Sequence, residues 1–146
     1  MKIGIGADNN AFQLKKFLIE KLESQGYVLK DYGCYSEDVI DYPGIAEKVS
    51  QGILSNEIDK GILLCGTGIG MAMAANKIKG IRAAQVHDIY SAQRAELSNN
   101  AHIITIGSKV VGADLAYALV HEFLSQNFVE SPSSKKIEQV MALEEK

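Results

Sequence analysis

Residues 60–77, KGILLCGTGIGMAMAANK, constrain the fold of this chain more than any other segment. An apolar run ends at Cys65, glycines then alternate with other residues at 66, 68 and 70, and a stretch rich in Ala and Met follows. The apolar run is typical of a buried parallel strand, and the small-residue stretch is typical of a helix. Backbone N–H groups at such a helix start favour an anion. The segment therefore predicts a strand, a tight turn and a helix that form an anion site beside a thiol.

The same alternation of strand and helix patterns extends along the chain. The strands are expected at 3–7, 27–32, 62–64, 81–86 and 103–106, and the helices at 12–22, 44–54, 69–78, 88–97, 112–124 and 135–144. We interpret Ser131-Pro-Ser-Ser as a break before the last helix. Five strands that alternate with helices favour a parallel sheet covered on both faces, with right-handed crossovers. The last helix has no obvious strand to cover, so we expect it to pack on another subunit.

The expected parallel sheet predicts where a ligand binds. In such folds, ligands bind beyond the carboxyl ends of the strands. This rule gathers five features at one edge: Asp8, the loop 33–43, the turn 65–70, His87 and the turn 107–112. We expect the functional site to lie there.

Length and charge exclude several classes of protein. A chain of 146 residues predicts one domain, over residues 1–146. The net charge of −3 gives no general attraction to nucleic acid or to an anionic membrane, so any phosphate binding must be local. No apolar stretch approaches the ~18 residues of a membrane span, and no secretory signal is recognisable at the start. We therefore expect a cytoplasmic protein with reduced thiols.

The glycine turn does not match the common nucleotide-binding motifs. A dinucleotide fingerprint requires Gly at its first, third and sixth positions. Counted from Gly66 the sixth position is Met71, and counted from Gly4 it is Asn9. The chain also lacks the Gly-Lys-Ser/Thr of a P-loop. The turn is thus no evidence for NAD or ATP, and a purely structural turn that needs close packing remains an alternative.

The two cysteines, Cys34 and Cys65, form no metal-type pair. Cys65 is either a small buried hydrophobe or, beside a helix N-terminus, a stabilised thiolate that acts as a nucleophile or a base. Cys34 follows a strand, and we interpret it as structural. Asp8 is either a helix cap or a carboxylate that faces the same crevice as Cys65.

The remaining polar candidates are ambiguous on sequence alone. A Cys–His pair needs a histidine close to Cys65, and the sequence does not show whether His87, His102 or His121 lies that close. We interpret His102 as a surface residue and His121, in the middle of a helix, as structural. Lys135 and Lys136 either form a solvated helix face or reach a phosphate.

Four segments together resemble one family: GILLCGTGIGMAMAANKIKGIRAA, the early GADNNAF, the Asp41-Tyr42-Pro43 loop and ITIGSKVVG. This is the ribose-5-phosphate isomerase B and galactose-6-phosphate isomerase family, and the resemblance runs over nearly the whole chain. It implies a Rossmann-like three-layer α/β/α sandwich with an extra C-terminal helix. It also implies a dimer or tetramer with active sites shared between subunits, and no metal or other cofactor.

The resemblance assigns candidate roles at the predicted edge. It implies that Cys65 takes the C2 proton of an open-chain aldose phosphate and that a cis-enediolate forms. The backbone of the turn would hold the oxyanion, through Gly66, Thr67, Gly68, Ile69 and Gly70. Asp8 matches a carboxylate that binds sugar hydroxyls or assists ring opening. Tyr42 and Thr67 match positions that line the site, and Asn99 matches an asparagine supplied by the neighbouring subunit.

The chain departs from the usual ribose-5-phosphate isomerase pattern at four positions. Asn9 and Ser98 stand where histidines are usual, and the second of these histidines opens the sugar ring. Pro132 stands in place of a phosphate-binding arginine, and Lys136 replaces another, which keeps the charge without the bidentate geometry.

These departures leave three hypotheses open. The chain is a homodimeric isomerase whose phosphate is held by Lys136, Asn9, Asn10 and backbone N–H groups, with ribose 5-phosphate as the leading substrate. Alternatively, it is a galactose-6-phosphate isomerase B-type subunit that needs a paralogous partner. The third hypothesis is a non-catalytic module that binds sugar phosphates.

Overall fold

The computed structural model describes residues 1–146 and contains one five-stranded parallel sheet, in the order β2-β1-β3-β5-β4. The strands are β1 (Lys2–Ala7), β2 (Val28–Asp31), β3 (Lys60–Cys65), β4 (Ala83–Gln85) and β5 (Ile103–Gly107). The helices are α1 (Phe12–Ser24), α2 (Tyr42–Leu54), α3 (Ile69–Asn76), α4 (Ile89–Leu97), α5 (Ala113–Ser125) and α6 (Pro132–Ala142), with 3₁₀ turns η1 (Asn9–Ala11) and η2 (Leu143–Glu145). The expected three-layer α/β/α sandwich is confirmed.

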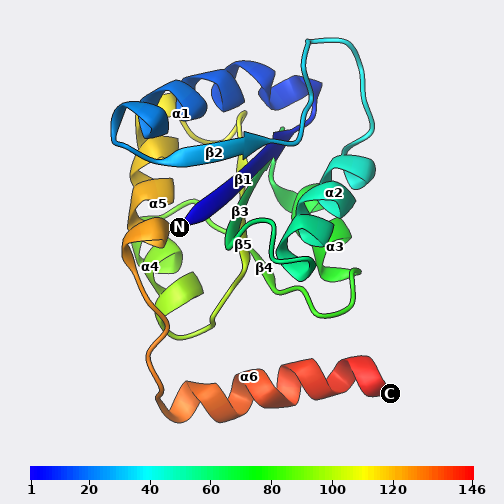
Figure 1. Cartoon of the computed structure of the whole chain (residues 1–146), viewed down its shortest axis with the longest axis vertical. Coiled ribbons are helices and arrows are strands. Elements are labelled where there is room, and N and C mark those ends of the chain that lie inside the picture. Colours follow the sequence, from blue (N-terminus) through cyan, green and yellow to red (C-terminus); the bar gives the residue numbers. More distant parts are fainter.

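Helices cover both faces of the sheet (Figure 1). One face packs against α1, α4 and α5, and alternate β1 residues such as Ile3 and Ile5 are fully buried there. The other face packs against α2 and α3, whose residues Val49 and Met71 are fully buried. Side chains of successive strand residues point to opposite faces, so a sheet with helices on both sides explains the near-continuous apolar strands.

Most boundaries lie within two residues of those expected, and the differences at α2, β4 and α6 have physical reasons. Helix α2 begins two residues earlier than expected, because Pro43 is tolerated in the first helical turn. Strand β4 has three residues instead of six, since it lies at the sheet edge and pairs with β5 alone. The prediction that Ser131–Ser134 forms a break is wrong. Ser131 is the N-cap of α6 in a capping box with Ser134, and Pro132 takes a first-turn position.

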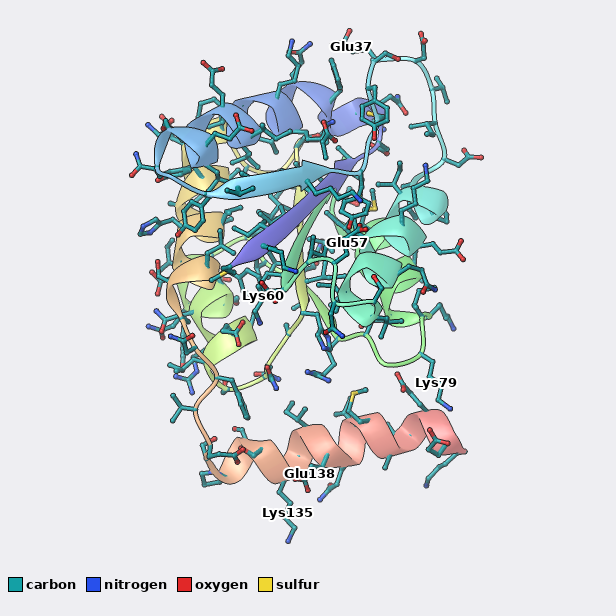
Figure 2. The ribbon with its side chains drawn as sticks, in the orientation of Figure 1. Glu37, Glu57, Lys60, Lys79, Lys135 and Glu138 are labelled. Atoms are coloured by element: carbon teal, nitrogen blue, oxygen red, sulfur yellow. The ribbon has the colours of Figure 1, made fainter.

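Helix α6 lies apart from the sandwich, across the end at which the strands begin (Figure 1). It buries none of its own residues. Its end is attached through Glu144, which accepts a hydrogen bond from the Gly80 N–H, and Arg82 contacts the Met141 sulfur. Figure 2 shows Lys135 and Glu138 pointing away from the sheet. As expected, α6 covers no strand.

Candidate active site

The carboxyl ends of three neighbouring strands bring the first site residues together. Ala7 of β1 pairs with Leu64 of β3, and Cys65 pairs with Gly107 of β5. The Asp8 N–H continues the ladder by donating to the Leu64 carbonyl at 3.1 Å. Asp8 and Cys65 therefore end neighbouring strands at one edge of the sheet, as the sequence predicts.

The turn after β3 directs a backbone N–H group toward the thiol of Cys65. The Gly68 N–H donates to Cys65 Sγ at 3.1 Å, and Cys65 is 5% exposed. Gly68 has φ +77°, a left-handed conformation that a glycine adopts without strain, and it is the N-cap of α3. The donor is oriented toward sulfur at a helix N-terminus, where negative charge on sulfur is favoured.

Two further turn residues have their polar groups directed within the turn. The Thr67 hydroxyl accepts a hydrogen bond from the Ile69 N–H at 3.2 Å, and both residues are exposed at the surface of the site. The N–H groups that follow in the first turn of α3, beginning with Gly70, have no intrahelical partner. The start of α3 therefore presents donors to a ligand anion.

Tyr42 lies directly on the start of α3. A Cβ atom added to Gly70 would come within 2.4–2.7 Å of the Tyr42 ring and hydroxyl. The first turn of α2 thus forms a wall of the site beside the glycine turn, as the resemblance implies.

Asp8 acts as a cap in this structure. Its carboxylate accepts hydrogen bonds from the Asn10 N–H at 2.9 Å and from the Asn10 side-chain amide at 3.3 Å. The capping interpretation is therefore correct, and the same carboxylate ends β1 beside Cys65. The Asn9 side-chain oxygen accepts from the Ile40 N–H at 3.2 Å. Asn9 thus ties the loop between β2 and α2 to the start of the site.

Four further residues lie at this edge. The sequence predicts His87 and the turn 107–112 here without assigning them a role, and it does not predict Gln85. Ser108 donates from its hydroxyl to the Asn10 carbonyl at 2.8 Å. Lys109 extends over the glycine turn, with its Cδ 3.6 Å from where a Gly66 Cβ would lie. The Gln85 amide donates to the Thr67 carbonyl at 2.8 Å, and His87 Nε2 accepts from the Gly107 N–H at 3.0 Å. Their common signal is position, because each ends or follows β4 or β5 at the carboxyl edge.

A cavity of about 380 Å³ adjoins this group. It lies between the starts of α1 and α5, and its lining includes Asn10, Gln13, Ser108, Lys109 and Gly112. Lys109 is the cation of this lining, so the cavity suits an anionic group attached to a ligand that reaches the glycine turn.

Three candidate site residues lie far from Cys65 within one chain. Ser98 and Asn99 follow α4, directly before β5 begins, so they lie at the opposite, amino edge of the sheet. Ser98 is buried, and its hydroxyl lies 3.1 Å from the Arg94 carbonyl and 3.1 Å from Asn99 Oδ1. Asn99 lines a groove of about 400 Å³ beneath α6. Lys136 is exposed on α6. A single chain does not join these residues to the thiol.

The other histidines do not join the site, whereas the second cysteine, Cys34, lies at the end of β1, where its N–H donates to the Ala7 carbonyl at 2.8 Å. His102 is half-buried at the amino edge, so its interpretation as a surface residue is wrong. Burial, together with the charges of Arg82 and Lys60, lowers the pKa of His102 to about 4. His121 is exposed on α5. Cys34 is buried, and burial raises the pKa of its thiol.

Two kinds of structural feature are absent from residues 1–146. No three His, Cys, Asp or Glu side chains gather as a metal site. No helix is both long enough and apolar enough to cross a membrane.

Comparison with known proteins identifies the family. The Ribose/Galactose Isomerase family matches residues 3–140. Ribose-5-P isomerase B of Listeria innocua is 46% identical over 100% of this chain and 99% of its own length. D-erythrulose-4-phosphate isomerase 2 of Mycolicibacterium smegmatis is 43% identical over 99% of this chain and 97% of its own length. Galactose-6-phosphate isomerase subunit LacB of Clostridium acetobutylicum is 34% identical over 94% and 79%.

Solved structures agree with this assignment. Ribose-5-phosphate isomerase B of Clostridium thermocellum superposes with a TM-score of 0.97 at 37% identity, over 99% of this chain and 98% of that one. Ribose-5-phosphate isomerase B of Mycoplasma genitalium, solved with bound ribulose-5-phosphate, superposes with a TM-score of 0.93 at 33% identity. The match covers 99% of this chain and 97% of that one. The matches span the whole sandwich, including the strand, thiol and glycine turn. This chain belongs to the ribose/galactose isomerase family and is a sugar-phosphate isomerase.

Proposed function

We propose that the chain interconverts an aldose phosphate and a ketose phosphate through a cis-enediolate, with Cys65 as the base and ribose 5-phosphate as the leading substrate. The observation that carries the proposal is the Gly68 N–H that donates to Cys65 Sγ at 3.1 Å, beside the start of α3. This arrangement gives the sulfur a hydrogen-bond donor and supplies further donors for an oxyanion.

The proposed chemistry needs one proton to move between two carbons. The Cys65 thiolate removes the proton from C2 of the open-chain aldose, and the electron pair of that bond forms the C1–C2 double bond as charge moves to O1. The backbone N–H groups at the start of α3 stabilise the enediolate oxygen. Cys65 then returns the proton to C1, the proton of the C2 hydroxyl passes to O1, and the C2 oxygen becomes the ketone. Asp8 and Asn10 bind sugar hydroxyls at the adjoining strand end.

The phosphate is proposed to bind cations from two chains. Lys109 lies over Gly66 in the same chain as the thiol. Asn99 lies at the opposite edge of the sheet and Lys136 lies on α6. Both would therefore serve the Cys65 site of a second copy. The exposed α6, which buries none of its residues within its own chain, supports this dimer. A paralogous chain in place of the second copy is the alternative, since one relative is a subunit of galactose-6-phosphate isomerase.

A tetrose phosphate is a second candidate substrate. In erythrose 4-phosphate the oxygen that would close a five-membered ring carries the phosphate, and erythrulose 4-phosphate has no hydroxyl placed to close such a ring, so both sugars stay open-chain. Such a substrate needs no ring-opening acid. Ser98 stands at the ring-opening position, and its hydroxyl is taken up by Arg94 and Asn99. A relative at 43% identity carries the name D-erythrulose-4-phosphate isomerase.

Proton exchange tests both the reaction and the base. The purified protein is incubated in D₂O with ribose 5-phosphate, galactose 6-phosphate or erythrose 4-phosphate, and loss of the C2 proton is followed by NMR. We expect exchange with at least one sugar and none with Cys65→Ala. Exchange that survives Cys65→Ala excludes Cys65 as the base. Binding of every sugar without exchange, even with a paralogue added, would favour the non-catalytic module.

A substitution at Ser98 separates the two substrates. If the active substrate forms a ring, Ser98→His is expected to raise kcat/KM for ribose 5-phosphate and to leave kcat/KM for erythrose 4-phosphate unchanged. The wild-type ratio of the two kcat/KM values then names the substrate.

The proposed compartment is the cytoplasm. Both cysteines are free thiols, and a thiol base needs a reducing environment.

A further inference from the structure

The end of β5 lacks a backbone partner on its outer side. The Val86 N–H donates to the Thr105 carbonyl at 3.0 Å, after which the chain of β4 leaves the sheet. Gly107 lies two residues beyond Thr105, so its N–H points to the same side. That N–H donates to Nε2 of His87 at 3.0 Å. An imidazole therefore completes the ladder where β4 has ended.

The backbone of Gly107 packs directly against the turn that follows Cys65. A Cβ atom on Gly107 would lie 2.6–2.8 Å from the backbone of Thr67. A Cβ atom on Gly68 would lie 3.1–3.2 Å from the backbone of Ile106 and Gly107. The two backbones are in direct contact, so the position of the Gly107 peptide sets the position of Gly68.

These contacts form a continuous path from His87 to the thiol. His87 holds the Gly107 N–H, Gly107 supports Gly68, and the Gly68 N–H donates to Cys65 Sγ. Thr105 also holds this turn, because its hydroxyl donates to the Gly68 carbonyl at 2.7 Å. Both Thr105 and His87 are side-chain supports of backbone groups at the site.

We infer that His87 is a positioning residue of the isomerase reaction: it accepts the Gly107 N–H and thereby fixes the turn that orients the Gly68 donor toward Cys65. The inference rests on the proposed role of Cys65. Because Nε2 accepts, the neutral ring carries its proton on Nδ1. The Nε2 atom is occupied by the backbone, so it is not the acid that opens a sugar ring.

Two substitutions at His87 separate positioning from mere packing. His87→Gln keeps an oxygen acceptor, and His87→Leu keeps bulk without one. We expect His87→Leu to lower kcat about tenfold or more, because sub-ångström errors at a reacting group cost this much. KM should change far less, since the turn acts on the thiolate and the developing oxyanion. His87→Gln should recover most of kcat. His121 is an exposed residue of α5, so the matched controls His121→Gln and His121→Leu should have the kcat of the wild type.

The reactivity of the thiol gives a readout that does not depend on turnover. Alkylation of Cys65 by iodoacetamide is followed by mass spectrometry of the Cys65 peptide. We expect a severalfold slower rate in His87→Leu and a nearly wild-type rate in His87→Gln. Equal kcat and alkylation rates in the wild type and His87→Leu, or equal losses in the Leu and Gln variants, would overturn the inference.

The hydrogen bond itself is measured in the wild-type protein, which avoids any failure of a variant to fold. In ¹⁵N-labelled protein, an N–H···N bond gives a scalar coupling between the Gly107 amide nitrogen and His87 Nε2. Absence of this coupling refutes the role of His87 and leaves the Cys65 exchange result standing. If the coupling is present and Cys65→Ala still exchanges, the proposed base is wrong and His87 positions no catalytic thiol.

Discussion

At the carboxyl edge of the sheet the start of α3 leaves backbone N–H groups without intrahelical partners, whereas at the amino edge charged side chains pair with one another. The carboxyl edge combines a thiol, a helix N-terminus and side chains such as Thr105 that hold backbone groups in place. The amino edge contains the ion pair of Lys60 with Glu96, whose side chains are 19% and 4% exposed. Lys60 also donates to the Ala101 carbonyl at 3.1 Å and lies at the lower end of the sheet in Figure 2.

The contrast indicates what each edge contributes within its own chain. A buried charge is tolerated only when it is paired, so the amino-edge cluster is a structural unit whose loss costs stability. Uncommitted N–H groups at a helix start are tolerated because solvent or a ligand satisfies them. We therefore expect substitutions at the amino edge to act mainly on unfolding, and substitutions at the carboxyl edge to act mainly on turnover.

The largest expected effect breaks the amino-edge ion pair. Glu96→Leu leaves Lys60 buried without its partner, and we expect the free energy of unfolding to fall by about 3–5 kcal/mol. Urea denaturation measures this change. The matched control is Glu145→Leu, which removes the exposed pair with Lys79 and is expected to cost about 0.5 kcal/mol. A loss below about 1 kcal/mol for Glu96→Leu would contradict a structural role for the pair.

The next effect falls on the carboxyl edge. In Gly107→Ala the new Cβ meets the Thr67 backbone, so the turn must shift. We expect kcat to fall about 10²-fold, equivalent to about 2.7 kcal/mol, as for loss of an oxyanion donor. Gly44→Ala is the control, because its Cβ meets nothing within 4 Å. If the kcat values of the two variants are equal, the packing of Gly107 does not position the turn.

The sequence predicted the sheet and the carboxyl edge because both depend on local patterns. Apolar runs ended by polar or glycine residues mark the strands, and parallel strands place their ends together. The start of α6 was missed because Ser and Pro occur both in loops and in capped first turns. The capping box becomes visible only when the Ser134 side chain is seen to return to Ser131.

Within the site, the residues that touch through backbone groups could not be predicted. Nothing in the pattern around His87 shows that β4 stops two residues before it and leaves the Gly107 N–H to a side chain. The burial of His102 was likewise missed, since its neighbours Arg82, directly before β4, and Lys60, in β3, come from distant parts of the sequence.

The third prediction concerns the pH dependence of stability. His102 has a pKa of about 4 in the folded protein against an ordinary value of 6.5, so the unfolded chain binds its proton more readily. This residue should therefore lower stability as the pH falls from about 6.5 to about 4, by about 2–3 kcal/mol in total. Urea denaturation of the wild type and His102→Gln at several pH values measures it. A pH dependence that is as steep in His102→Gln as in the wild type would exclude His102 as its source.

The smallest effect tests the link between the two edges. Lys136→Ala is expected to raise KM for the sugar phosphate about fivefold, or about 1 kcal/mol, through loss of a charged hydrogen bond. Its neighbour Lys135, which points away from the sheet in Figure 2, is the matched control. Steady-state kinetics of both alanine variants give the comparison. If the two KM values agree, Lys136 does not bind the phosphate.

The central claim is that the carboxyl edge of one chain and the amino edge of a second form one active site. Subunit complementation tests it most directly: Cys65→Ala and Asn99→Ala are purified separately, then unfolded and refolded together in equal amounts. We predict that each variant alone is nearly inactive and that the mixture regains about one quarter of wild-type activity. In a symmetric dimer, half of the dimers are mixed and each mixed dimer has one intact site. Activity of the mixture that equals the mean of the two separate variants would contradict the shared site.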